Sequence, residues 1–207
     1  MAKSTASAAR VARLVEALGN DIVFGAYPQG ARLKLVDLQA RYGASAFEVR
    51  QALPELKARR LVEHVVNAGF RVARPDEGER AQMREVRVLL ETAAARATVG
   101  RASPADVARL RGLALRFERA VARGDRAALI ASNDAFHAGL YALAGNAVLA
   151  GLIGELRERD TSGTTGRWRS AEGLREASAD HLAIVEALGA GDAGRLERLV
   201  AAHIRAF

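Results

Sequence analysis

Apolar residues recur at helical spacing over most of this chain. In the first part, one amphipathic helix is predicted to end near Gly25, with an apolar face formed by Val11, Leu14, Val15, Leu18 and Ile22. A turn rich in Gly and Pro leads to Gly30, and a shorter helix is then predicted to end at Tyr42. Each of these helices has one side that is suited to packing against a core.

The next helix, after a tight turn at Gly43, has the most informative pattern. Ser45 and Glu48 have the S-x-x-E spacing, in which each side chain satisfies a backbone amide of the other residue. The apolar face of the helix is formed by Val49, Ala52, Leu53 and Leu56. The opposite side faces outward and consists of Ala46, Phe47, Arg50 and Gln51. A capped helix with an exposed first turn suits the major groove of DNA, although this pattern alone fits an ordinary helical hairpin equally well.

Pro54 lies inside this helix, where it removes the hydrogen bond to the carbonyl of Arg50. A proline in a helix interior costs about 3 kcal/mol or imposes a kink. We expect the helix to bend at this position and not to break.

Two short apolar runs follow at residues 61–66 and 69–73, with Asn67, Ala68 and Gly69 at the tip between them. These runs predict a β-hairpin. A helix, a turn, a second helix and a hairpin in this order predict a winged helix-turn-helix domain over residues 1–74. In such a domain the hairpin is the wing, which lies along the DNA backbone or the minor groove.

After a polar linker at residues 75–78, every segment except one has helical spacing. The predicted helices cover residues 79–100, 104–123, 125–144, 147–160, 170–190 and 192–207, with Ser103, Asp125 and Asp192 as expected N-caps. The exception is the Gly- and Thr-rich stretch 161–169, which we expect to form a mobile loop near the opening of the bundle. The predicted fold class is therefore mainly α, with an antiparallel six-helix bundle over residues 79–207.

The composition excludes several classes of protein. Without Cys, the chain has neither disulfides nor a thiolate metal site. It has no apolar stretch approaching the roughly 20 residues of a membrane span, and its first residues lack the apolar run of a secretory signal. We therefore expect a cytoplasmic protein without a membrane partner.

The formal net charge of +7 agrees with a nucleic-acid partner without proving one. Residues 1–78 contain 12 basic and 8 acidic residues, whereas residues 79–207 contain 19 and 16. The density of positive charge is thus higher in the part that is predicted to bind DNA.

The ordered motifs of the first part resemble the DNA-binding domain of GntR-family bacterial transcription regulators. The motifs are Gly25-x-Tyr27-Pro28-x-Gly30-x-x-Leu33, Leu38-x-x-x-Tyr42-Gly43-x-Ser45, Val49-Arg50-x-Ala52-Leu53-x-x-Leu56, Leu61-Val62-Glu63 and Gly69-Phe70-x-Val72. The resemblance implies that Ser45, Arg50 and Gly69 stand where the family contacts operator DNA. We add Gln51 and Asn67, because they lie on the outward face and at the wing tip.

The chain departs from this family at the start of the recognition helix. The family usually has Ser-Arg-Thr there, whereas this chain has Ser45-Ala46-Phe47. A common DNA-contacting Arg is therefore missing, and the operator sequence of the family does not transfer. Phe47 is predicted to meet a thymine methyl group or, alternatively, to cover a neighbouring side chain.

The histidines form a second group of candidate functional residues. The chain has four His, and three of them, His137, His181 and His203, fall in three different predicted helices of the bundle. Asn133 and Asp134 lie one turn before His137 and can share its face. Imidazole is a common ligand of divalent metals, and bundle cores bring such side chains together. On spacing alone, a set of ordinary surface or core histidines is the more frequent outcome.

A further resemblance favours a metal site. The bundle resembles the FCD domain of the FadR subfamily, closest to its six-helix VanR-like branch, through Asn133-x-x-Phe136-His137-x-x-Leu140, Gly145-Asn146, His181 with Ile184 and Ala187, and His203. The resemblance implies one divalent cation bound by Asn133, His137, His181 and His203, with Asp134 as a substitute for Asn133. We expect Zn²⁺, with Ni²⁺ or Mn²⁺ as alternatives. The neutral amide of Asn133 is a weaker ligand than the carboxylate found in other members.

The same resemblance implies a small carboxylate effector at the open positions of the ion. Arg87, in the first helix of the bundle, is placed to bind it, although a surface ion pair with Glu91 at i+4 also explains this residue. Trp168 is predicted to cover the pocket from the loop or, alternatively, to be a packing residue.

Three functions fit these observations. A homodimeric transcription regulator that responds to a small carboxylate, and that is not an enzyme, uses both halves of the chain on double-stranded operator DNA. A metal-dependent hydrolase is an alternative because three His with an open position also form a catalytic zinc site, with Asp134 as the only obvious general base. The third is a DNA-binding protein whose bundle only dimerises. We predict the first.

Overall fold

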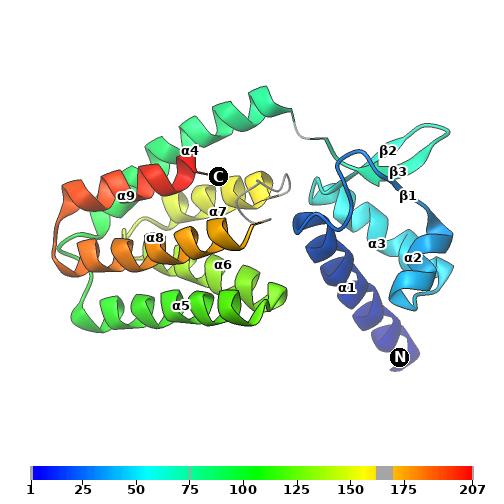
Figure 1. The fold of residues 1–207 in the computed structure, drawn as a ribbon, viewed down its shortest axis with the longest axis horizontal. Coiled ribbons are helices and arrows are strands. Elements are labelled where there is room, and N and C mark those ends of the chain that lie inside the picture. The colour runs from blue at the N-terminus through cyan, green and yellow to red at the C-terminus, as the bar shows by residue number, and fades with distance from the viewer. Residues whose placement is uncertain (1, 75, 162–169, 207) are drawn as a thin grey trace. The chain divides into compact units, whose positions relative to one another are not determined.

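The structure, a computed structural model, describes residues 2–74, 76–161 and 170–206. These residues form nine helices and three short strands (Figure 1). They divide into two compact units, of which one ends at Asp76 and the other begins at Glu77. Each unit has its own apolar core.

The N-terminal unit is a winged helix-turn-helix, as predicted. Its elements are α1 (Ala2–Val23), β1 (Arg32–Leu33), α2 (Leu35–Tyr42), α3 (Ala46–Ala58), β2 (Val62–Val65) and β3 (Gly69–Val72). Their apolar faces meet in one core, in which the side chains of Val15, Leu18, Val49 and Leu56 are fully buried. The helices thus bury the faces that the apolar spacing assigned to the core.

The sheet of this unit contains a strand that the sequence did not reveal. β1 pairs with β3 in antiparallel register, with Leu33 opposite Phe70, and β3 also pairs with β2. The strand order is therefore β1-β3-β2. A strand of two residues is too short to show the alternation from which strands are predicted.

The start of α3 has the predicted capping box. The Ser45 hydroxyl accepts a hydrogen bond from the Glu48 amide, and the Glu48 carboxylate accepts one from the Ser45 amide at 2.8 Å. The preceding turn is closed by Gly43, whose φ of 59° lies in the left-handed region. The helix then continues through Pro54 to Ala58, so the proline does not break it.

The second unit is the predicted bundle. Its helices are α4 (Glu77–Thr98), α5 (Pro104–Arg123), α6 (Arg126–Ala142), α7 (Ala147–Thr161), α8 (Ala171–Gly189) and α9 (Ala193–Arg205). Ser103, Asp125 and Asp192 cap three of them through hydrogen bonds to backbone amides, as expected. α4 begins two residues earlier than predicted and has two acidic residues in its first turn, where negative charge is favourable.

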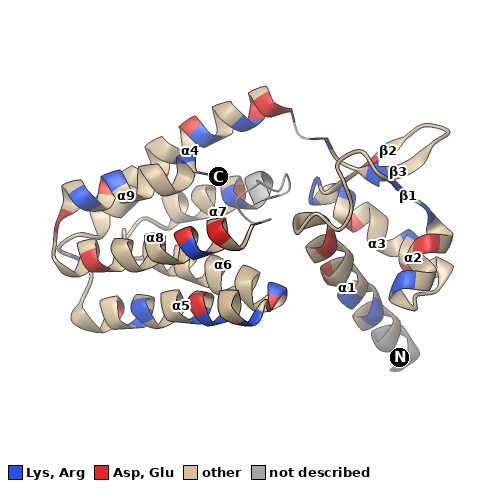
Figure 2. Ribbon diagram, viewed as in Figure 1, with Lys and Arg blue, Asp and Glu red and all other residues tan. Residues whose placement is uncertain are grey.

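Within the bundle, α4 packs beside α9, and α5 packs against both α6 and α8 (Figure 1). Phe117, Phe136, Leu140 and Ile184 are among its fully buried side chains. None of the helices in the described ranges combines the length and the apolar character that a bilayer span needs. Basic and acidic residues are interspersed over the helices of both units, in agreement with the modest charge excess (Figure 2).

Candidate functional site

Three imidazoles converge in the core of the bundle. His137 comes from α6, His181 from α8 and His203 from α9, and each is at most 3% exposed. The three ring centroids are 5.0 to 5.2 Å from one another. One nitrogen of each ring can be chosen so that the three atoms lie within 4.8 Å of one another. The structure thus brings together the three histidines that the sequence singled out.

The distances between these nitrogens suit one metal ion. The Nε2 atoms of His137 and His181 are 3.2 Å apart. Two nitrogens about 2.1 Å from a common ion are separated by roughly 3.0 Å at a right angle and roughly 3.4 Å at a tetrahedral angle. The third nitrogen lies within 4.8 Å of the other two, so the widest pair has to close by up to about 1.4 Å to reach the tetrahedral separation. The same Nε2 contact serves as a hydrogen bond when one of the rings carries the proton.

The environment of His137 keeps its ring neutral. Burial lowers the pKa of His137 well below 6.5, and the positive charges of Arg157, His181, His203 and Arg87 lower it further. A neutral imidazole has a lone pair available for a metal and no proton to lose first. No hydrogen-bond partner of the His137 Nδ1 atom is found in the described part of the chain.

Asn133 and Asp134 differ in burial. Asn133 is buried one helical turn before His137, and its amide donates a hydrogen bond of 3.3 Å to the Asp134 carboxylate. Asp134 is exposed. Asn133, through its carbonyl oxygen, is therefore the better candidate for a fourth ligand than Asp134.

Arg87 is buried, so the interpretation of this residue as a surface arginine was wrong. Its predicted partner was right, because its Nε atom donates to the Glu91 carboxylate at 2.7 Å. Glu91 is fully buried and also accepts hydrogen bonds from the Tyr141 hydroxyl at 2.6 Å and from Arg157 at 3.2 Å. The network therefore joins α4, α6 and α7 around one carboxylate.

This network places positive charge beside the histidines. Burial raises the pKa of Glu91, but the charges of Arg157 and Arg87 and the hydrogen bond from Tyr141 outweigh burial, so that the pKa is lowered overall. Glu91 is therefore ionised and binds two guanidinium groups. The sequence did not single out Arg157 or Tyr141, although Tyr141 follows His137 by one turn and its spacing was a usable signal. Trp168 lies outside the described residues.

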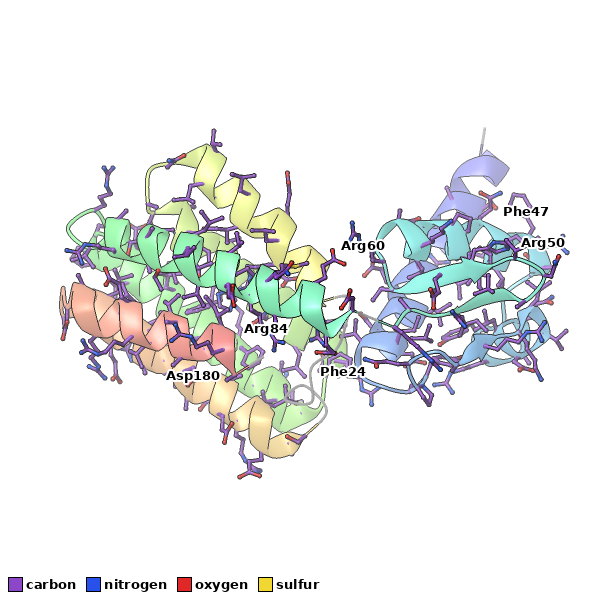
Figure 3. The ribbon with its side chains drawn as sticks, turned by 90° about the horizontal axis from the view of Figure 1, so that it is seen from above. Phe24, Phe47, Arg50, Arg60, Arg84 and Asp180 are labelled. Atoms are coloured by element: carbon purple, nitrogen blue, oxygen red, sulfur yellow. The ribbon has the colours of Figure 1, made fainter. Side chains whose placement is uncertain are left out.

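The residues predicted to bind DNA lie on the surface of the N-terminal unit. Phe47 is 59% exposed, and it lies next to Arg50 on the outer side of α3 (Figure 3). Gln51 is exposed on the same helix. At the wing tip, Asn67 and Gly69 have φ angles of 60° and 78°, which form the tight turn between β2 and β3.

The start of α3 is fixed by ionic contacts that the sequence did not indicate. Arg10 on α1 forms an ion pair of 2.8 Å with Glu48. The Ser45 hydroxyl also donates to the Glu48 carboxylate at 2.9 Å. Ser45 is thus engaged in the cap and holds the first turn of α3 in place.

Two families of known proteins match the chain. The family described as FCD domain matches residues 82–206, which is more than half of the chain. The family described as bacterial regulatory proteins, gntR family, matches residues 10–72.

Individual relatives agree with these matches. A "Probable D-xylose utilization operon transcriptional repressor" of Paenarthrobacter nicotinovorans is 29% identical over 192 residues, which cover 90% of this chain and 82% of the relative. Among solved structures, E. coli McbR/YncC has a TM-score of 0.68 at 24% identity, covering 95% of this chain and 93% of its own. A GntR transcriptional regulator from Rhodococcus sp. RHA1 has a TM-score of 0.68 at 22% identity, covering 95% and 94%. These two structures show a shared fold.

The buried carboxylate should be essential for stability. We expect Glu91→Gln to lower the free energy of unfolding by about 3 to 5 kcal/mol, because it leaves two guanidinium groups without their buried counter-charge. Urea unfolding of the metal-free protein measures the loss. The matched control is Glu197→Gln, which breaks the exposed pair with Arg96 and should cost less than about 1 kcal/mol. Equal losses in the two variants would contradict the network.

The burial of His137 predicts a pH dependence of stability. Its folded-state pKa is lowered, so the unfolded chain binds a proton near pH 6.5 that the folded chain does not bind. Above pH 6.5, the neutral ring of His137 does not lower the free energy of unfolding through protonation of the unfolded chain. As the pH falls below 6.5, the free energy of unfolding decreases by up to about 1.4 kcal/mol per pH unit. We expect the stability of chelator-treated wild-type protein to fall more steeply between pH 6.5 and 5.5 than that of His137→Gln. Parallel curves for the two proteins would show that His137 is protonated in the fold.

Proposed function

We propose that this chain, which belongs to the GntR family of bacterial regulatory proteins and carries an FCD domain, responds to a small carboxylate bound at a divalent metal ion in its bundle. The chain is a transcription regulator, since the GntR family is a family of regulatory proteins and a curated relative is named a "Probable D-xylose utilization operon transcriptional repressor". The hydrolase alternative is set aside for the same reason. We assign DNA binding to residues 1–74, the linker to residues 75–78, and effector binding and dimerisation to residues 79–207. The last two residues of that linker, Glu77 and Gly78, already belong to α4.

Operator recognition is assigned to the exposed side of α3 and to the wing. Arg50 is long enough to reach base edges or phosphates, and Phe47 offers an apolar surface to a thymine methyl group. Gln51 adds a donor and an acceptor on the same side, whereas Asn67 and Gly69 bring the wing tip to the backbone. Ser45 contributes the capped and rigid start of the helix.

The observation that carries the metal proposal is the convergence of three buried imidazoles at ligand distances. Burying a polar atom without a partner is unfavourable, and the Nδ1 atom of His137 has no hydrogen-bond partner among the described residues, so the convergence of three imidazoles in one core supports a common ligand. His137, His181 and His203 would bind the ion, with Asn133 as the fourth and weaker protein ligand. Three imidazole nitrogens with one amide oxygen suit Zn²⁺, and Ni²⁺ or Mn²⁺ are the alternatives.

The effector is proposed to be a small carboxylate. The bound ion would supply open positions for an oxygen anion. Arg87 and Arg157 supply positive charge close to His137, as their effect on its pKa shows. Both arginines bind Glu91, and an incoming carboxylate would share or replace that contact. That Trp168 covers the effector pocket stays a prediction.

The surface of the bundle favours a homodimer. In the described part of the bundle, the exposed large apolar side chains all lie on α4 or α7, as Val86, Leu89, Val148 and Leu152. Each pair has i,i+3 or i,i+4 spacing and therefore lies on one side of its helix. The ion pair between Glu91 and Arg157 holds these two helices together. A second copy of the chain would cover this surface, and a two-fold dimer would read two operator half-sites.

The first prediction for this function concerns operator binding. A duplex selected by the wild-type protein from a random library provides the probe. We expect Arg50→Ala to weaken binding by about 1 to 3 kcal/mol without loss of helicity. The matched control is Arg116→Ala, which removes an exposed arginine from the bundle. Unchanged affinity of Arg50→Ala in a titration would remove this residue from the recognition surface.

A second prediction concerns the effector response. The wild-type protein loaded with Zn²⁺ should change its operator affinity with at least one member of a panel of small carboxylates, such as acetate, lactate, malate and citrate. His181→Ala should lose both metal and response but keep its effector-free operator affinity, because the site and α3 lie in different units. His64→Ala, on β2 of the wing, should keep its metal content. A full response in metal-free His181→Ala would contradict the proposal.

The dimer surface gives a third prediction. Leu89 is 70% exposed on α4, and Leu89→Glu should convert a dimer into a monomer in light scattering, because it places a charge in the apolar surface. The control is Val36→Glu, which introduces the same charge at an exposed apolar position of α2. A variant that stays dimeric would place the interface elsewhere.

A further inference from the structure

Asp180 contacts the histidine cluster from outside. It precedes His181 on α8, but consecutive helical residues point about 100° apart, so the two side chains leave the helix in different directions. The helices α8 and α9 lie side by side (Figure 1), and Asp180 is labelled in Figure 3. The Asp180 carboxylate lies 3.0 Å from the Nδ1 atom of His203 on α9. Asp180 is half-buried, whereas His203 is 3% exposed.

The contact determines where His203 carries its proton. An ionised carboxylate only accepts hydrogen bonds, so Nδ1 of His203 has to be the donor. In a neutral imidazole, the other nitrogen, Nε2, then has the lone pair. Nε2 is therefore the atom of His203 that can bind a metal, and its ring lies beside those of His137 and His181.

We propose that Asp180 is a positioning residue of the metal site, which holds His203 in the tautomer and the orientation that a metal requires. This inference rests on the proposed metal site, but it assigns a role to a residue that binds neither ion nor effector. A histidine ligand that donates its second N–H to a carboxylate is a stronger base and a better oriented ligand. Loss of such a partner typically lowers metal affinity by about 10- to 100-fold.

The alternative is that Asp180 only ties α8 to α9. The chain provides a matched control for that role, since Glu186 on α8 and Arg195 on α9 form an exposed ion pair of 3.6 Å between the same two helices. Glu186→Ala removes a carboxylate between these helices without touching a histidine. A contact that only links the two helices would affect the stability of the fold but not the tautomer of His203.

The test compares wild type, Asp180→Ala, Asp180→Asn and Glu186→Ala in the full-length protein. Competition with a chromophoric chelator measures the affinity for Co²⁺, whose visible spectrum also reports the geometry of the site. We expect Asp180→Ala to lose about 10- to 100-fold in affinity. Asp180→Asn should lose less, because its carbonyl still accepts the Nδ1 proton, and Glu186→Ala should match wild type.

A second measurement does not depend on metal. Long-range ¹H–¹⁵N spectra of the metal-free protein distinguish an imidazole that is protonated at Nδ1 from one protonated at Nε2. His203 should be protonated at Nδ1 in wild type and in Glu186→Ala, and it should shift toward Nε2 in Asp180→Ala. Equal Co²⁺ affinity in wild type and Asp180→Ala, or an Nε2-protonated His203 in wild type, would overturn the role of Asp180 alone. A wild-type chain that binds no Co²⁺ would overturn the metal site itself and this role with it.

Discussion

Burial of three imidazoles and one carboxylate inside the bundle is the constraint on which the rest of this structure depends. A buried polar group without a partner costs about 1 to 3 kcal/mol, and a buried charge costs more. Glu91 meets this requirement through two arginines and Tyr141. The histidines meet it only in part, since His137 Nδ1 has no hydrogen-bond partner among the residues that the structure describes. Apolar side chains at these positions would avoid the cost of burying polar atoms. The presence of imidazoles there therefore favours a bound ligand.

The two polar centres are continuous in space. His137 and Tyr141 lie one turn apart on α6 with ring centroids 6.1 Å apart, and Tyr141 donates to Glu91. Glu91 in turn binds arginines of α4 and α7, the helices that carry the exposed apolar residues of the bundle. An effector that shifts this network would therefore act directly on the proposed dimer surface. Its effect on operator affinity is limited by its differential affinity for the two dimer geometries.

Features that depend on local chemistry were predictable from the sequence. The Ser45–Glu48 capping box, the N-caps of the bundle and the helical ranges follow from spacing and residue type, and the structure has them. Features that depend on distant partners were not predictable. β1 exists only through its pairing with β3. Arg87 is buried and binds Glu91, which Tyr141 of α6 and Arg157 of α7 also contact. Asp180 of α8 contacts His203 on the neighbouring helix α9. Convergence of the histidines was indicated by a resemblance, because spacing alone does not determine which helices pack together.

The central claim is that one divalent ion binds between His137, His181 and His203. Diffraction data from crystals of protein purified without chelator, collected on both sides of the zinc absorption edge, test it most directly. The proposal predicts one anomalous peak per chain, about 2.0 to 2.1 Å from a nitrogen of each of the three imidazoles. Crystals soaked in Zn²⁺ that show no peak at this position, while the three rings keep their positions, would contradict it.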